Sequence, residues 1–498
     1  MCGIFFSLKG KIEIIMTIEY RNYIRLGGLM RLGCDHEKNV KEISRRLGVG
    51  KSFDCIERHL LVGGEDVTFF YIDGFIKDAE LQRVMQQVTS ADKISSAREL
   101  LSRLAYVEVG TMGDIDGIVA AVLSGQTALL AGAFSDVAIL VDARTYPART
   151  TAEPDSDRVM QGARDGFVET LVMNTALIRR RIRDPRLVMQ HFTVGTSSRT
   201  DVVLCYMEGV ASPKLVRDIE ERISGIRTKS LTLGYQSLSE CLIRRGWLNP
   251  FPKIRSTERP DTAAAQIMEG SVIVICDTSP QAMILPTSVF DYLQQTDDYY
   301  FPPLTGTYLR LVRTAILLLS LFVTPLWYLS LEYAALLPPA LAFLIPDSPG
   351  ALPIMLQLLL VELAIDGLKI ASMNTPDMLS NSLSVIGALI LGDFAVSVGW
   401  VCEDVILYMA FVALANFAQQ NAELGYAIKF VRVLTLIAVW VIGVWGLAAG
   451  FALFIFLVST NRTVTGRRDY LYPLIPFNRK AMSRLLFRMK KEDVDKGE

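Results

Sequence analysis

The polar N-terminal part of the chain lacks the short motifs that usually identify an enzyme. It contains no G-x-G-x-x-G turn, no Walker loop and no Ser/His/Asp constellation, so nothing indicates nucleotide binding or triad chemistry. The seven cysteines include no C-x-x-C pair, and no secretory leader is recognisable. We therefore expect a protein that is not an enzyme and has no cofactor, with its N-terminal region in a reducing, cytoplasmic compartment.

Two patterns near the start suggest chemistry but lack the partners that the chemistry needs. Met1-Cys2-Gly3-Ile4-Phe5 is similar to the N-terminal nucleophile of class II glutamine amidotransferases, yet no matching Gly-rich, Asn-containing loop follows. An extension fits better, with Met1 and Met16 as alternative starts. Cys34-x-His36 and Cys55-x3-His59 supply zinc-ligand types, with the second pair spaced for one helical face, but the gap between the pairs fits no standard finger. We expect buried thiols, surface histidines and no metal site.

Charge is absent from the 28 residues between Val433 and Thr460. At about 1.5 Å per residue, one helix of that length reaches roughly 42 Å, which exceeds a hydrocarbon core of about 30 Å. The composition agrees, because 51% apolar residues and a mean hydropathy of +0.32 are high for a soluble protein. However, 21% charged residues are too many for a chain that lies wholly in a membrane. The sequence therefore predicts an integral membrane protein with a separate polar region.

The membrane part is predicted between Leu311 and Thr460. Its candidate spans are Leu311–Leu331, Pro353–Ser372, Leu383–Val401, Val405–Ala418 and Val433–Thr460. Leu336–Ile345 is too short to cross alone, and a re-entrant segment is the alternative. The tail 461–498 has ten basic and five acidic residues, which places the C-terminus in the cytoplasm. With both termini there the number of crossings is even, and four and six both remain open.

Acidic residues inside the apolar block are the first candidates for an ion path. The block Leu311–Thr460 carries nine acidic and four basic residues, a net of 4 − 9 = −5. Glu362, Asp366 and Lys369 follow at spacings of four and three, so they share one helical face that must meet protein or water. Either Asp366 and Lys369 form an internal salt bridge, or Glu362 repeats around an oligomer as a cation-selecting acidic ring. Asp393 is a further candidate, with a hydrogen bond to a neighbouring helix as its alternative role.

A duplication organises the polar part of the chain. Val67–Gly74 aligns with Val202–Gly209 at an offset of 135, and Asp116–Leu130 aligns with Asp261–Ile275 at an offset of 145. Each copy predicts a buried strand, an acidic-Gly turn and then an amphipathic helix, beginning at Val67–Gly74 in the first copy and at Val202–Gly209 in the second. We therefore expect an N-terminal extension over 1–44 and two related α/β subdomains over 45–150 and 193–305.

An arginine-rich helical connector, residues 151–192, lies between the two copies. Its distinctive residues are Glu153, Arg158, Arg164, Gly166, Phe167, Asn174 and Arg179. Clustered arginines are typical of nucleic-acid binding, but here acidic residues interleave with them, and the apolar residues have helical spacing. The pattern favours a connector that packs against protein with paired charges, and no nucleic-acid partner is expected.

The connector and several downstream motifs resemble the spore germination protein A-subunit family, the germinant receptor A-type proteins. The matching motifs are Thr257-Glu258-Arg259-Pro260-Asp261, Pro353–Gly367 and Ser384–Gly392. Three more segments are most similar to the stage V sporulation protein AF branch of that family: Gly246–Pro250, Gly306–Arg310 and Leu474–Arg479. The chain departs from the family at Ala163, Asp165 and Asp393, where Pro, Glu and Gln are usual, and the last adds an acid at mid-membrane depth.

The resemblance implies an α+β multidomain membrane protein, with two cytoplasmic subdomains, an α-helical transmembrane bundle over 306–460 and a basic cytoplasmic tail over 461–498. It implies a homo-oligomeric ring, a pentamer, that conducts cations across the spore inner membrane and amplifies germination. A small companion membrane protein, other germination proteins and the lipid bilayer are its implied partners. A nutrient germinant receptor subunit and a non-conducting membrane scaffold are the alternatives.

Overall fold

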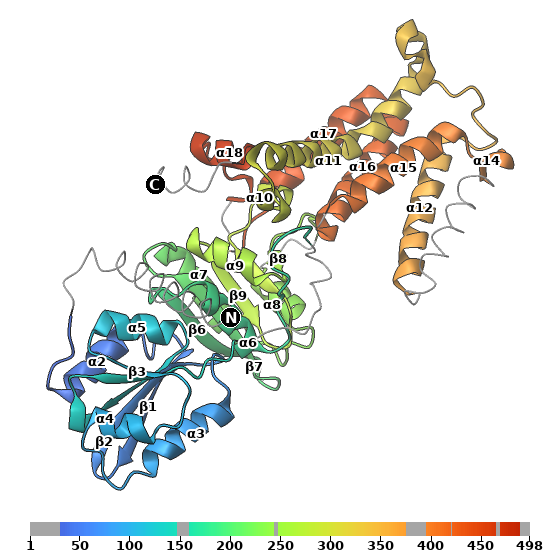
Figure 1. The fold of residues 1–498 in the computed structure, drawn as a ribbon. Coiled ribbons are helices and arrows are strands. Elements are labelled where there is room, and N and C mark those ends of the chain that lie inside the picture. Colours follow the sequence, from blue (N-terminus) through green and yellow to red (C-terminus); the bar gives the residue numbers. More distant parts are fainter. Residues whose placement is uncertain are drawn as a thin grey trace, which may run out of the picture. The chain divides into compact units, whose positions relative to one another are not determined.

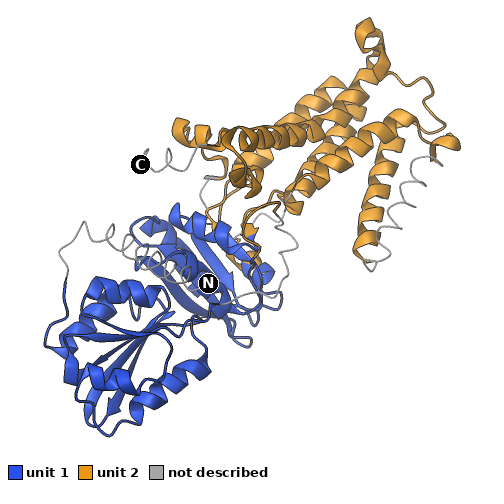
Figure 2. Ribbon diagram, viewed as in Figure 1, with its two compact units in different colours: residues 1–154, 165–238, 257–283 blue, residues 155–164, 239–256, 284–498 orange. Residues whose placement is uncertain are grey.

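A computed structural model describes residues 30–146, 159–243, 248–374, 395–419, 421–464 and 469–488. The chain forms two compact units (Figure 2). Unit 1 comprises residues 1–154, 165–238 and 257–283, and unit 2 comprises residues 155–164, 239–256 and 284–498. The two β-sheets belong mainly to unit 1, and the long helices belong to unit 2 (Figure 1).

The first sheet of unit 1 has the strand order β1-β2-β4-β5-β3. Its strands are β1 (Cys55–Val62), β2 (Glu65–Ile72), β3 (Val109–Met112), β4 (Thr127–Ala131) and β5 (Ala138–Val141). Its helices are α2 (His36–Leu47), α3 (Asp78–Thr89), α4 (Ala97–Arg103) and α5 (Ile115–Leu123), with a 3₁₀ turn η2 (Gly132–Phe134). All four strand pairings are antiparallel. The expected α/β subdomain is therefore an α+β one, because α/β domains have mainly parallel strands.

Strand β2 is apolar on both faces, and this explains why helices cover both sides of the sheet. Phe70 packs in the same cluster as helices α2 and α5, whereas Phe69 packs with α3 and α4. Successive strand residues point to opposite faces, so the two phenylalanines supply two separate cores. The sheet lies between these helix pairs in Figure 1. Ile43 and Leu47 of α2 belong to one core, so the expected boundary at residue 44 would cut through this helix.

The second sheet repeats the order of the first as β6-β7-β9-β10-β8. Its strands are β6 (Leu187–Val194), β7 (Thr200–Met207), β8 (Arg255–Thr257), β9 (Val272–Cys276) and β10 (Ala282–Leu285), with helices α6 (Leu171–Arg181), α7 (Pro213–Ser224), α8 (Tyr235–Leu242) and α9 (Pro260–Met268). Strands β2 and β7 begin 135 residues apart, and helices α5 and α9 begin 145 residues apart, which are the two offsets in the sequence. Gly74 and Gly209 follow the equivalent strands with φ of 80° and 82°, a conformation that favours glycine.

Unit 2 begins with short turns and continues into a helical bundle. Its elements are η3 (Val289–Leu293), α10 (Asp297–Tyr300), α11 (Pro303–Glu332), η4 (Ala334–Leu336), η5 (Pro339–Leu344), α12 (Ile354–Met373), α14 (Ala395–Ser397), α15 (Glu403–Phe417), α16 (Ala422–Ile442), α17 (Val444–Thr460), η7 (Asp469–Leu471) and α18 (Arg479–Leu486). Helix α11 packs on α16 and α17, in a cluster with Leu317 and Leu321, and on α15 through Trp327, which shares a second cluster with residues of α12.

Two helices of the described chain, α11 and α16, are long and apolar enough to cross a membrane. Length and composition alone are weak evidence, because a core helix of a soluble protein passes the same test. Here only 33% and 44% of their apolar windows are buried, which is low for core helices. Large apolar side chains are exposed elsewhere in the bundle as well, including Leu363, Leu407 and Trp445. This much exposed apolar surface favours lipid or another subunit as its surroundings.

The prediction of one long span from Val433 to Thr460 was wrong. The chain breaks at Gly443, with φ of 57° and ψ of −134°, and continues as α17 packed against α16. A Cβ atom at Gly446 would lie 2.2 Å from the backbone of Ala438, and one at Gly450 would lie 2.1 Å from Thr435 Oγ1. The two helices therefore approach closely because the α17 side of the contact has no side chain.

The other candidate spans differ less from the structure. Pro353–Ser372 corresponds to α12, Leu311–Leu331 lies within α11, and Val405–Ala418 corresponds to α15. The short Leu336–Ile345 segment forms the 3₁₀ turns η4 and η5. Most of Leu383–Val401 lies outside the described residues.

Candidate functional site

The charged residues of α12 face a second set of charged residues on α16. Helical spacing places Glu362 and Asp366 on one side of α12, and Lys429 and Arg432 are three residues apart on α16. Glu362, Lys429 and Arg432 are all buried, with side-chain exposed fractions of 11%, 10% and 2%. An apolar helix carries such charges into a bundle only if they are paired or reach water.

All four charged groups take part in one network of ion pairs. Glu362 Oε2 lies 2.6 Å from Arg432 Nη2, and Glu362 Oε1 lies 3.0 Å from Lys429 Nζ. Lys429 also pairs with Asp366. Lys429 therefore bridges both carboxylates, and the network joins residues that are 63 to 70 positions apart in the sequence. Because two carboxylates meet two cations, the network itself is neutral when all four groups are ionised.

Lys369 does not form the expected salt bridge with Asp366. Its ammonium group lies 4.6 Å from the centre of the Tyr426 ring, a cation–π arrangement with α16. The predicted salt bridge between Asp366 and Lys369 was therefore wrong, because Asp366 pairs with Lys429 on the neighbouring helix. Lys429 and Arg432 were missed because the predicted span began at Val433, immediately after them. Their spacing of three in an apolar stretch is the signal that could have found them.

A cavity of about 40 Å³ opens beside these ion pairs. Its polar lining comes from Glu362, Asp366, Lys369, Asn416, Tyr426 and Lys429. A water molecule needs roughly 10–15 Å³ of such volume, so the cavity has room for a few waters. Asp366 is the more accessible of the two carboxylates, with 33% of its side chain exposed against 11% for Glu362. The arrangement therefore combines a buried ion pair at Glu362 with a partly exposed carboxylate at Asp366.

The arginine-rich connector contributes a second buried ion pair, in unit 1. Arg179 on α6 is fully buried and donates to both carboxylate oxygens of Asp54 through Nε and Nη2, at 2.7 and 3.1 Å. It also donates to Ser52 Oγ and to the carbonyl of Leu187, which begins β6. Burial acts to lower the pKa of Arg179, but the charge of Asp54 prevails and raises it above the usual value. Arg179 thus ties the connector to both sheets.

The remaining connector residues have structural surroundings or lie outside the described chain. Asn174 is buried and clasps the backbone of Val168, with hydrogen bonds of 2.6 and 2.8 Å. The buried Phe167 donates its backbone N–H to Glu258, whereas Gly166 is buried and Arg164 is exposed. Asp165, at the position where Glu is usual, pairs with Arg181 at 2.5 Å. Glu153, Arg158 and Asp393 lie outside the described residues.

The cysteine and histidine pairs near the start do not form a metal site in the part of the chain that the structure describes. Cys55 and His59 lie on strand β1, so helical spacing does not apply to them. Burial raises the pKa of Cys55 to about 12, which keeps its thiol protonated. His36 and His59 both lie within hydrogen-bond distance of Thr68 Oγ1, at 3.4 and 3.1 Å.

Comparison with known proteins then decides the family. Residues 41–496 match the family described as Bacillus/Clostridium GerA spore germination protein. The chain belongs to the GerA family. The resemblance that the connector and the downstream motifs indicated is therefore confirmed.

Individual relatives of this GerA-family chain match along most of its length. It is 36% identical to stage V sporulation protein AF of Bacillus subtilis, over 91% of this chain and 92% of that protein. It is 28% identical to the membrane protein YfkQ of the same species, over 84% of this chain and 82% of the relative. A solved structure, the N-terminal domain of the A subunit of the Bacillus megaterium spore germinant receptor GerK3, is similar over 52% of this chain and 97% of that domain, with 24% identity and a TM-score of 0.40.

Proposed function

We propose that the protein is the subunit of a homo-oligomeric ion channel, a pentamer, which releases cations through the spore inner membrane during germination. Its role is to amplify the response rather than to sense a nutrient. The cytoplasm holds unit 1 and the C-terminal tail, and a small companion membrane protein and other germination proteins act with it. Membership of the GerA family supports a germination role, and the similarity to stage V sporulation protein AF favours this branch of it.

The observation that carries the proposal is the partly exposed carboxylate of Asp366, which lines a cavity in an apolar bundle. The cavity there holds carboxylate, amide, phenol and ammonium groups, which resemble the mixed polar lining of a cation path. Glu362 is less suited to a lumen, because it is buried between Arg432 and Lys429, whereas Asp366 pairs only with Lys429 and keeps 33% of its side chain exposed. We therefore assign selection of the cation to Asp366 and its cavity, and assign Glu362 to holding α12 against α16.

Potassium flux from liposomes tests this assignment. Asp366→Asn removes the accessible charge and keeps the side-chain shape, so we expect cation flux to fall by about tenfold through loss of local cation enrichment. Glu332→Gln is the matched control, since Glu332 is an exposed acid at the end of α11 and lies outside the cavity. We expect the flux of the control to equal that of the unchanged protein.

Glu362→Gln distinguishes a buried ion pair from an acidic ring. If Glu362 formed a ring around a lumen, its loss would change cation preference as strongly as the loss of Asp366. We expect a less stable bundle with cation preference retained, because Arg432 loses its buried partner.

No flux from any variant or from the unchanged protein, together with intact assembly, would instead support a non-conducting scaffold. Flux that appears only with an added nutrient would favour a germinant receptor subunit.

A further inference from the structure

The C-terminal segment 472–488 exposes an unusual amount of apolar surface for a short segment. Helix α18 contains no buried residue. The exposed large apolar side chains of the segment are Tyr472, Leu474, Ile475, Phe477, Leu486 and Phe487. Phe477 is 68% exposed and Ile475 is 58% exposed, so unit 2 itself does not cover them. This many exposed apolar side chains in one short segment indicate a binding surface.

The same segment is purely basic. Residues 470–488 contain Arg479, Lys480, Arg484 and Arg488 and no acidic residue, and the next acid is Glu492. Arg479 and Lys480 are exposed in the first turn of α18, where Asn478 caps the helix by accepting from Ala481 N at 3.2 Å. Cations in the first turn of a helix oppose its dipole, so local helix stability does not explain their presence.

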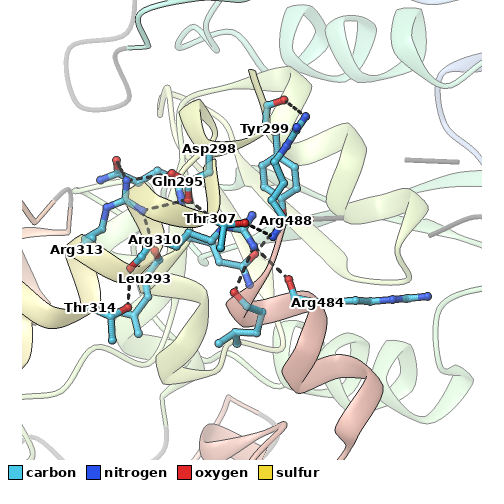
Figure 3. Close-up of polar contacts among 12 residues, drawn as sticks. Leu293, Gln295, Asp298, Tyr299, Thr307, Arg310, Arg313, Thr314, Arg484 and Arg488 are labelled. Atoms are coloured by element: carbon cyan, nitrogen blue, oxygen red, sulfur yellow. Dashed lines mark hydrogen bonds and ion pairs between the residues drawn. The ribbon is translucent and has the colours of Figure 1, made fainter. Parts of the chain in front are cut away.

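Hydrogen bonds fix the segment beside the first turns of α11 (Figure 3). Arg310 donates to the carbonyls of Arg484 and Leu485 at 3.1 and 3.3 Å, and Arg488 N donates to Thr307 Oγ1 at 3.1 Å. The guanidinium group of Arg310 is held in turn by the buried carboxylate of Asp298 at 3.2 Å. The position of α18 is therefore set by α11 and not by a flexible tether.

The contact places α18 at a definite depth if α11 crosses a membrane. Helix α11 has 30 residues, or about 45 Å of rise, so it is longer than a hydrocarbon core of about 30 Å. Its first turns would then lie at headgroup level, where Leu304, Tyr308 and Leu311 are exposed as well. Arg313 shares the carboxylate of Asp298 with Arg310, so this carboxylate offsets only one of the two guanidinium charges.

We propose that residues 472–488 form an interfacial anchor that binds a membrane leaflet rich in anionic phospholipids. The apolar side chains enter the boundary of the acyl chains, and Arg479 and Lys480 bind phosphate groups of the lipid headgroups. Basic, amphipathic segments with aromatic residues suit this depth. Charge complementarity selects this occupant, because a second copy of the same surface would bring further positive charge and no acid. The anchor goes beyond ion conduction and requires only that the bundle crosses the membrane.

Hydrogen exchange of the full chain in lipid nanodiscs tests the anchor. We expect the backbone amides of 472–487 to exchange more slowly in phosphatidylglycerol than in phosphatidylcholine. The double variant Arg479→Ala/Lys480→Ala should reduce this difference in exchange rate about 25-fold, because each basic residue near an anionic leaflet contributes about fivefold to membrane binding. The matched control is Lys93→Ala/Arg98→Ala, which removes two exposed charges from unit 1 and should leave the difference unchanged.

A second variant keeps the charges and tests the apolar contact. Phe477→Ser should speed exchange of the segment in both lipids, because Phe477 is the most exposed large apolar side chain of the segment. Equal exchange in the two lipids would overturn the role of the headgroups. Protection that persists in detergent and rises with protein concentration would show that another copy covers the surface, and would also overturn the proposal. Failure of the chain to enter nanodiscs would contradict its membrane residence, a result separate from both of these.

Discussion

At the residue scale, the buried pair of Arg179 and Asp54 is expected to be a major determinant of the stability of unit 1. Asp54→Asn would leave a fully buried guanidinium group without its countercharge. Loss of one partner from a buried ion pair costs about 3–5 kcal/mol, so we expect the free energy of unfolding of unit 1 to fall by about that amount. Urea unfolding of the detergent-solubilised chain measures this free energy, with protease cleavage within residues 50–190 as the readout of unfolding.

The control for this prediction is an ion pair at the surface of the same unit. Arg103 pairs with Glu99 on α4 at 2.8 Å, and their side chains are 46% and 36% exposed. Arg103→Ala should lower the free energy of unfolding by only about 0.3–0.5 kcal/mol, because water screens such a pair. Similar losses for the two variants would contradict a special role for the buried pair.

Single charged residues also mark the limit of what sequence could predict about the site. Glu362 and Asp366 could be found because an acid in an apolar helix is costly and therefore conspicuous. Their partners Lys429 and Arg432 could not be assigned, because pairing across 63 to 70 residues depends on how α12 and α16 pack. Local spacing suggested Lys369 instead, which lies near Asp366 in sequence but contacts Tyr426.

At the element scale, the hairpin of α16 and α17 depends on two glycines on α17. A side chain at Gly450 would overlap Thr435, since even a Cβ would approach its Oγ1 to 2.1 Å. Gly450→Ala should therefore force α16 and α17 apart and lower the melting temperature of the bundle in detergent. Overpacking of this kind typically costs about 1–3 kcal/mol.

Gly367→Ala is the matched substitution on α12. No atom lies within 4 Å of a Cβ there, so the change should be neutral or slightly stabilising through its higher helix propensity. Thermal unfolding of both variants, followed by circular dichroism, makes the comparison. A melting temperature for Gly450→Ala that equals that of Gly367→Ala would mean that the helices do not approach at this glycine.

Elements with strong periodic patterns were predicted well, and those set by a backbone break were not. The duplication anticipated the paired strands β2 and β7 and helices α5 and α9, because each copy repeats the same buried strand and turn glycine. The apolar run through Gly443 gave no local reason to end a helix, since glycine is tolerated inside apolar helices. Its conformation follows from the packing of α17 on α16, which a one-dimensional pattern does not contain.

At the scale of the whole molecule, the exposed apolar surface of unit 2 needs lipid or another protein chain to cover it. Helix α12 carries Leu356, Leu363 and Ile370 at intervals of seven, and all three are exposed. Such a stripe on one helix face suits lipid or a neighbouring subunit equally. Within one chain Lys429 and Arg432 balance the charges of Glu362 and Asp366, so the ring proposal depends on neighbouring copies that bring several Asp366 carboxylates around one path.

The mass of the protein in mild detergent tests assembly separately from conduction. We expect light scattering of the full chain to give a homopentamer, after correction for bound detergent. Asp366→Asn should retain this mass while it loses cation flux, because Asp366 pairs within its own chain and its removal leaves Glu362 to join α12 to α16. Leu363→Arg should reduce the mass if the exposed stripe on α12 lies between subunits, since a buried unpaired cation would oppose association. A monomer that still conducts would contradict the ring, because a single chain would then supply the whole path.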